Sequence, residues 1–136
     1  MLFIRLCPYL EKADRYKPML NNSPADIPLQ LKRAFSFRES LGLNTNAMRL
    51  VNSQGDGLEG LIIDRFNKHF VVYILDARWH PHHKTIRDAL AEHFDVAYLV
   101  FKDRTVSDAR SASHIAVDVR IGAGNSKTIV EENGLR

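Results

Sequence analysis

A glycine-rich connection between two short apolar segments constrains the fold of this chain more than any other feature. The segments are residues 48–51 and 61–66, and the run Gly-Asp-Gly-Leu-Glu-Gly occupies positions 55–60 between them. Glycine adopts positive φ at little cost, so this composition is typical of a β-hairpin connection. Turn geometry alone accounts for the glycines; a close approach of the backbone to a neighbouring segment is the alternative.

A helix is expected directly before this hairpin. Asp26 is suited to cap its N-terminus, Pro28 falls in its first turn, where a missing N–H is harmless, and Gly42 is suited to end it. Apolar residues recur at helical spacing, which predicts one buried face. These residues are Ile27, Leu31, Ala34, Phe35 and Leu41.

Further strands and a second helix are expected after the hairpin. Asn67 and Lys68 form a turn into an apolar run over residues 69–75, rich in β-branched and aromatic side chains, which predicts a central strand. A helix with Pro81 near its start follows. Its buried side is expected to contain Ile86, Ala89, Leu90, His93 and Phe94. Later strands are expected at residues 96–101, 115–121 and 128–130.

Together these elements predict an α+β fold: a small mixed β-sheet with a hairpin and two helices, of β-β-α-β-β type. A chain of 136 residues is long enough for one domain with its own core. The single cysteine, Cys7, excludes an internal disulfide framework and favours a reducing compartment. No apolar run approaches the length of a membrane span, so a cytoplasmic location without membrane contact is expected.

The positive charge of the chain is mild and unevenly placed. The formal net charge is +3, and all of the excess lies in residues 1–40, which hold seven Lys or Arg and four Asp or Glu. Lys32, Arg33 and Arg38 flank the apolar face of the first helix and suit either phosphate contacts or ordinary solvation. Arg104 and Arg110 suit phosphate contacts or pairing with the nearby Asp103 and Asp108. The balance is compatible with nucleic-acid binding without requiring it.

No catalytic or metal-binding constellation stands out from the residues. His80, His82 and His83 are close in sequence, but neighbouring residues diverge around a helix and no acidic residue completes a ligand set. The pair Gly122 and Gly124 lacks the third glycine and the following helix of a dinucleotide loop. We therefore expect no catalytic, cofactor-binding or metal-binding residue in this chain.

Two motifs resemble a known enzyme family. Thr-Asn-Ala-Met-Arg-Leu-Val at residues 45–51, followed by the run from Gly55 to Phe66, closely resembles the signature of the RlmI-type large-subunit ribosomal RNA cytosine-C5 methyltransferases. Residues 24–41 are similar to the family's preceding helix with its arginine. Residues 129–135 are similar to the strand that opens its catalytic domain. The resemblance covers about residues 24–135.

The resemblance implies a chain that is one part of a larger enzyme. Residues 1–23 would be a connector with a remnant of an RNA-binding PUA domain, residues 24–128 the central domain, and residues 129–136 the start of the methyltransferase domain. S-adenosylmethionine (SAM) would bind to that later domain and not to this chain. The central domain would position ribosomal RNA; a structural module without RNA contact, such as a homodimer interface, is the alternative.

The residues expected to contact RNA phosphates are all basic. They are Arg49, Arg65, Arg104 and Arg110, together with Lys32 and Arg33. Each has a structural alternative; for Arg49 and Arg65 it is pairing with Asp56 or Asp64.

The sequence also departs from the family pattern at three places. The family segment with two arginines resembles residues 104–110, which keep both arginines but have Val106 in place of an aspartate. Ser113 and His114 stand where the family has Glu-Gly, and Glu59 stands where it has proline. These changes put a family-like role of residues 104–110 in doubt.

Overall fold

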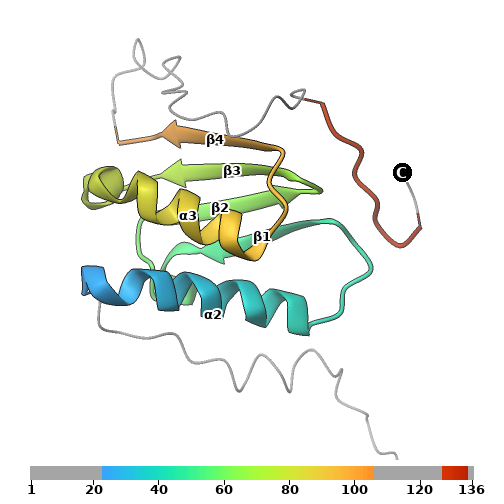
Figure 1. Cartoon of the computed structure of the whole chain (residues 1–136), viewed down its shortest axis with the longest axis horizontal. Coiled ribbons are helices and arrows are strands. Elements are labelled where there is room, and N and C mark those ends of the chain that lie inside the picture. Colours follow the sequence, from blue (N-terminus) through green and yellow to red (C-terminus); the bar gives the residue numbers. More distant parts are fainter. Residues whose placement is uncertain (1–22, 106–126, 135–136) are drawn as a thin grey trace, which may run out of the picture.

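A computed structural model describes residues 23–105 and 127–134 of the chain. Helix α2 (Ile27–Ser40) precedes three strands, β1 (Ala47–Asn52), β2 (Leu61–Phe66) and β3 (His69–Ile74), and helix α3 (His83–His93) leads into β4 (Tyr98–Asp103) (Figure 1). Three short 3-10 helices precede or link these elements: η1 (Pro24–Asp26), η2 (Ser53–Asp56) and η3 (Ala77–His82).

The four strands form one mixed sheet in the order β1-β2-β3-β4. β1 and β2 pair antiparallel, as do β2 and β3, whereas β3 and β4 pair parallel and are connected through α3. The turn between β2 and β3 has Asn67 at a φ of 58°, a left-handed conformation that asparagine tolerates. The predicted α+β class, with its mixed sheet, its hairpin and two helices, is confirmed. After α2 the described elements run strand, strand, strand, helix, strand.

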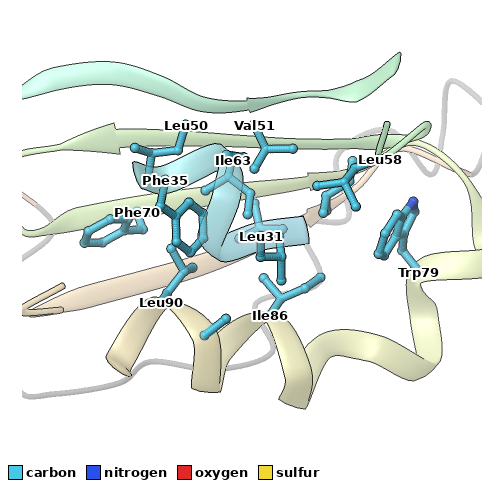
Figure 2. Close-up of a cluster of buried hydrophobic side chains, with 14 of the residues drawn as sticks. Leu31, Phe35, Leu50, Val51, Leu58, Ile63, Phe70, Trp79, Ile86 and Leu90 are labelled. Atoms are coloured by element: carbon cyan, nitrogen blue, oxygen red, sulfur yellow. The ribbon is translucent and has the colours of Figure 1, made fainter. Parts of the chain in front are cut away.

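Both helices cover the same face of the sheet. Val51, Ile63, Val72 and Phe101 are neighbours in register across the four strands, and all four are buried against the helices. The helices contribute to the same core Leu31 and Phe35 from α2, and Ile86 and Leu90 from α3 (Figure 2). A register shift between Arg49 and Val51 in β1 lets both Leu50 and Val51 be buried. We call the helix-covered side the inner face and the opposite side the outer face.

The predicted capping of the first helix is wrong in one respect. Asp26 occupies the N-cap position, but its side chain makes no capping hydrogen bond. The reason is that Asp26 is the last residue of η1 and already has helical dihedral angles, φ −90° and ψ −12°, whereas a capping side chain requires an extended backbone. Pro28 lies in the first turn and Gly42, at φ 62°, follows the helix end, both as predicted.

Two strand predictions need correction, and other expectations lie outside the described residues. β4 begins at Tyr98 and not at residue 96, because parallel pairing starts with Tyr98 opposite His69. Residues 128–130 form no strand; the segment after them makes a single antiparallel bridge, from Glu132 to Thr45. The predicted strand at residues 115–121 and the PUA-like remnant lie outside the described residues.

Candidate nucleic-acid interface

The sheet separates the basic residues that were expected to act together. Side chains alternate between the two faces of a strand, so the strand residues fall into two sets. Arg65 is in register with Phe70 and Leu99, which belong to the core, and therefore lies on the inner face. The outer face of the strands carries the other set: Ala47, Arg49, Asn52, Ile62, Asp64, Phe66, His69, Val71, Tyr73, Tyr98, Val100 and Lys102.

Arg49 lies on the outer face in a two-point ion pair with Asp64. Its Nε and one Nη donate to the two carboxylate oxygens at 2.8 and 3.2 Å. The hydrogen bond that Arg49 donates to Asp64 raises the pKa of Arg49 above its ordinary value. This pairing confirms one of the two structural alternatives for Arg49. A phosphate at this position would have to compete with the carboxylate.

The guanidinium group of Arg65 makes two contacts with neighbouring residues of the fold. Its Nε donates to the carbonyl of Asn67 at 2.9 Å, and its Cζ lies 4.9 Å from the centre of the Phe94 ring. The side chain thereby joins the β2–β3 turn to the end of α3. The predicted pairing of Arg65 with Asp56 or Asp64 is wrong.

The helix residues of the predicted set lie on the helical side of the molecule. Lys32 Nζ forms an ion pair with Glu92 at 2.9 Å, which connects α2 to α3. Arg33 is exposed on α2. Arg110 lies outside the described residues.

Arg104 and Lys102 form a different arrangement, around Tyr73. Lys102 is directly opposite Tyr73 in the parallel register, with its Nζ 5.6 Å from the ring centre, and Arg104 Cζ lies 6.0 Å from that centre. Across residues 23–105 and 127–134, neither cation takes part in an ion pair. These two residues are the basic groups best placed to receive an external anion.

Of the two partners predicted for Arg104, Asp103 makes no ion pair with it, and Asp108 lies outside the described residues. Asp103 instead accepts hydrogen bonds from the backbone N–H and hydroxyl of Thr105, at 2.9 and 2.6 Å, and contacts His80 Nε2 at 2.9 Å. The Thr105 hydrogen bonds, with the attraction of His80, hold the pKa of Asp103 below its usual range.

The other end of β3 and β4 holds a second aromatic pair on the outer face. The rings of His69 and Tyr98 lie 5.4 Å apart, and both residues are half-buried. Sequence reasoning missed this pair together with Tyr73 and Lys102. Alternation within each run places them on one face, but only the parallel register brings them side by side.

The three clustered histidines have separate environments. His80 contacts Asp103, His82 lies beside Trp79 with ring centres 5.8 Å apart, and His83 stacks on Phe101 at 4.4 Å. Within the described part of the chain, no three metal-ligating side chains form a group.

Both explanations of the glycine-rich connection, turn geometry and close packing of the backbone, apply to it. Gly57 and Gly60 have φ of 71° and 86°, which the turn requires. Gly60 also packs closely, since a Cβ added there would lie 2.5 Å from Cβ of Asp76. Trp79 closes this contact by donating from Nε1 to the carbonyl of Glu59 at 2.8 Å.

This connection does not fit the SAM cofactor that the resemblance implies for the whole enzyme. It joins one strand to another, whereas a nucleotide-binding loop joins a strand to a helix N-terminus. The space at Gly60 is filled by Asp76.

No described helix is long and apolar enough to span a membrane.

Arg38 forms an ion pair with Asp56, and neither the phosphate contact nor the ordinary solvation expected for Arg38 predicts this pair. Arg38 is only 14% exposed and pairs with the fully buried Asp56. It is therefore neither a solvated helix residue nor an accessible phosphate ligand.

Comparison with known proteins identifies the fold. No protein-family model and no curated protein matches the sequence. Among solved structures, SMU.776, described as a candidate methyltransferase complexed with SAH, matches with a TM-score of 0.62 at 18% identity over 88% of this chain and 30% of its own. A candidate SAM-dependent methyltransferase from Streptococcus mutans matches with a TM-score of 0.53 at 20% identity over 65% of this chain and 24% of its own. This chain thus spans less than a third of either protein and shares the fold of that part.

Proposed function

We propose that this chain is the RNA-positioning part of a SAM-dependent methyltransferase that acts on C5 of cytosine in ribosomal RNA. Two findings support the methyltransferase assignment. The described fold matches under a third of two proteins described as candidate methyltransferases. The hairpin motif at residues 45–66 resembles the signature of the cytosine-C5 family. Such an enzyme would work in the cytoplasm, where ribosomal RNA is found.

The observation that most supports an RNA contact is the arrangement of Lys102 and Arg104 at Tyr73. Two cations lie over an aromatic ring on the outer face of the sheet, which the described helices do not cover. Lys and Arg side chains bind phosphate oxygens and thereby fix the register of a nucleic acid without reading its sequence. Arg49 contributes positive charge to the same face, although Asp64 neutralises most of it.

The proposed role follows from the chemistry of the target atom. C5 of a cytosine in a stacked, paired strand is not accessible to an enzyme, so the nucleotide has to be separated from its neighbours. SAM, bound outside the described residues, would supply the methyl group. The residues of this chain would hold the flanking phosphates while the target base is displaced.

A structural module without RNA contact is the second candidate. Lys32, Arg49 and Arg65 favour it, because each is engaged in a contact within the fold. In that case the sheet would serve only to join neighbouring domains or a second copy of the chain.

Binding measurements on the full chain distinguish these functions. Fluorescence anisotropy with a labelled ribosomal RNA fragment is expected to show an affinity that falls as salt is added, because phosphate contacts release counterions. If no RNA binds at low salt, the structural module without RNA contact is the function that the result supports. Calorimetry with SAM is expected to show no tight binding, and a methyl-transfer assay no activity. Tight SAM binding would contradict the assignment of cofactor binding to another part of the enzyme.

A further inference from the structure

The outer face of β3 and β4 combines rings and cations in an order that suits one class of ligand. One end has Tyr73 with Lys102 and Arg104, the other end has His69 with Tyr98, and Val71 and Val100 lie between them. Of the two valines, Val71 is half-buried and Val100 is buried at 6% exposure, so Val71 contributes more apolar surface between the two ring clusters. Aromatic rings alternating with basic residues along a surface are typical of single-stranded nucleic-acid binding.

The spacing of the rings is too large for two successive bases of a stacked strand. His69 and Tyr73 are four residues apart on β3, which corresponds to about 13 Å along a strand. Successive bases in a duplex are only about 3.4 Å apart. A base that stacks on one of these rings also has to present a face that is free of its neighbouring base, as bases do in RNA loops and single strands.

The two cation contacts of the Tyr73 ring are long, and the residue is only half-buried. At 5.6 and 6.0 Å from the ring centre, the two cations are at the outer limit of cation–π distances. Both lie over the ring at that distance, so a base that stacks on Tyr73 would replace two long contacts. A base stacked on Tyr73 would then bring its own phosphate within reach of Lys102 or Arg104.

The charge of this surface disfavours a second copy of the chain as its occupant. Within the four described strands, Asp64 is the only carboxylate on the outer face, and Arg49 neutralises it. A two-fold interface would place this face against its own copy, and the face carries more cations than unpaired carboxylates. The positive charges would repel one another, whereas a polyanion would be attracted.

We propose that the outer face of β3 and β4 is a platform for single-stranded RNA, with one base stacked on Tyr73, another at the His69–Tyr98 pair, and phosphates at Lys102 and Arg104. This inference rests on the proposed function and specifies which face binds RNA and in which form. The contacts use no 2′-hydroxyl group, so single-stranded DNA is expected to bind to the platform as well.

The test is anisotropy on the full chain with a labelled oligouridylate of about ten nucleotides, a length that spans such a site. Replacing Tyr73 by leucine (Tyr73→Leu) is expected to weaken binding about fivefold or more, because it removes a stacking surface. Tyr73→Phe keeps the ring and is expected to bind like the wild type. This pair separates loss of stacking from loss of the hydroxyl group. Circular dichroism confirms that each variant is folded.

The phosphate contacts are tested by salt dependence. Lys102→Gln and Arg104→Gln are each expected to reduce the slope of log affinity against log salt by about 0.7, the contribution of one phosphate contact in a single strand. Lys84→Gln is the charge-matched control, since Lys84 is an exposed residue of α3 on the other side of the molecule. It is expected to leave both affinity and slope unchanged.

Several outcomes would overturn the platform. If RNA binds but Tyr73→Leu has no effect, or if a blunt RNA duplex binds as tightly as the single strand, the platform is wrong while the proposed function stands. If the wild type binds no RNA of either form, both fail. A concentration-dependent dimer in sedimentation that Tyr73→Leu abolishes would assign this face to a second copy.

Discussion

Arg38 and Asp56 connect helix α2 to the glycine-rich connection through two parallel hydrogen bonds. Nη1 and Nη2 of Arg38 lie 2.5 and 2.7 Å from the two carboxylate oxygens, and the Asp56 side chain is fully buried. Asp56 also accepts the backbone N–H of Asn52 at 2.6 Å. The carboxylate thus joins the end of β1, the turn η2 and the helix at one point. A buried pair of this kind stabilises a structure only while both partners are present.

Arg38→Met is expected to lower the free energy of unfolding by about 3 kcal/mol, because it leaves the buried Asp56 carboxylate without its counter-ion. Urea denaturation followed by circular dichroism measures the change. Adding Asp56→Leu to this variant is expected to recover part of the loss, since an apolar pair avoids the uncompensated charge. A single variant as stable as the wild type would contradict the structural role of the pair.

Gly60→Ala is expected to destabilise the fold by about 2–4 kcal/mol. The reason is that alanine at φ 86° is strained and its Cβ would lie 2.5 Å from that of Asp76. Two other glycines serve as graded controls. Gly42→Ala has open space but φ 62°, so about 1 kcal/mol is expected, and Gly55→Ala has neither constraint and is expected to be neutral. Thermal denaturation of the three variants checks the order, and a neutral Gly60→Ala would contradict the close packing.

The elements with strong local patterns could be predicted from the sequence. The hairpin, the two helices and the strand at residues 69–75 each follow from apolar spacing and turn residues, which act over a few positions. The register of β4 could not, because its parallel pairing with β3 depends on how the connecting helix α3 packs on the face of the sheet. Capping by Asp26 was predicted from residue type, whereas the preceding turn η1 decides its backbone geometry.

The candidate site, too, could be predicted from the sequence only in part. Composition identifies Arg49, Arg65 and Arg104 as basic residues but gives no information on which of them has a partner in the fold. Arg38 and Asp56 are 18 positions apart, so no local rule connects them. Lys102 and Tyr73 meet only through the sheet register. The accessible cations could therefore be separated from the structural ones only in three dimensions.

Asn46→Ala is expected to release the segment that runs beside the start of β1. The Asn46 side chain accepts the backbone N–H of Glu131 at 2.8 Å and donates to the carbonyl of Ile129 at 3.4 Å, so it substitutes for a neighbouring strand. These contacts are exposed, and the free energy of unfolding is expected to fall by only about 1 kcal/mol. Hydrogen exchange at the Glu131 amide is expected to become faster.

Asn44→Ala is the matched control for this variant. Asn44 contacts the same segment through its backbone carbonyl, which accepts the N–H of Asn133 at 2.7 Å and is kept in alanine. Exchange at Glu131 is expected to remain as in the wild type. Equal acceleration in both variants would contradict a specific role of the Asn46 amide.

Asp103→Asn is expected to reduce stability near neutral pH and to have a smaller effect in acid. Hydrogen bonds from Thr105, together with the attraction of His80, lower the pKa of Asp103 in the folded state. Its contribution is therefore fully present above the unfolded pKa of about 3.9 and is lost as pH falls through the lower folded pKa. The side chain is 25% exposed, which limits the expected difference to about 0.5–1 kcal/mol.

Urea denaturation of wild type and Asp103→Asn at about pH 7 and about pH 3 or below measures this dependence. The difference between the two proteins is expected to shrink in acid, because the wild-type carboxyl group becomes protonated and then resembles the amide. Asp95→Asn provides the comparison, since the Asp95 side chain is 78% exposed and its surface pair with Lys68 contributes little at either pH. A difference for Asp103→Asn that is the same at both pH values would show that the loss comes from the altered hydrogen-bond geometry and not from the charge of Asp103.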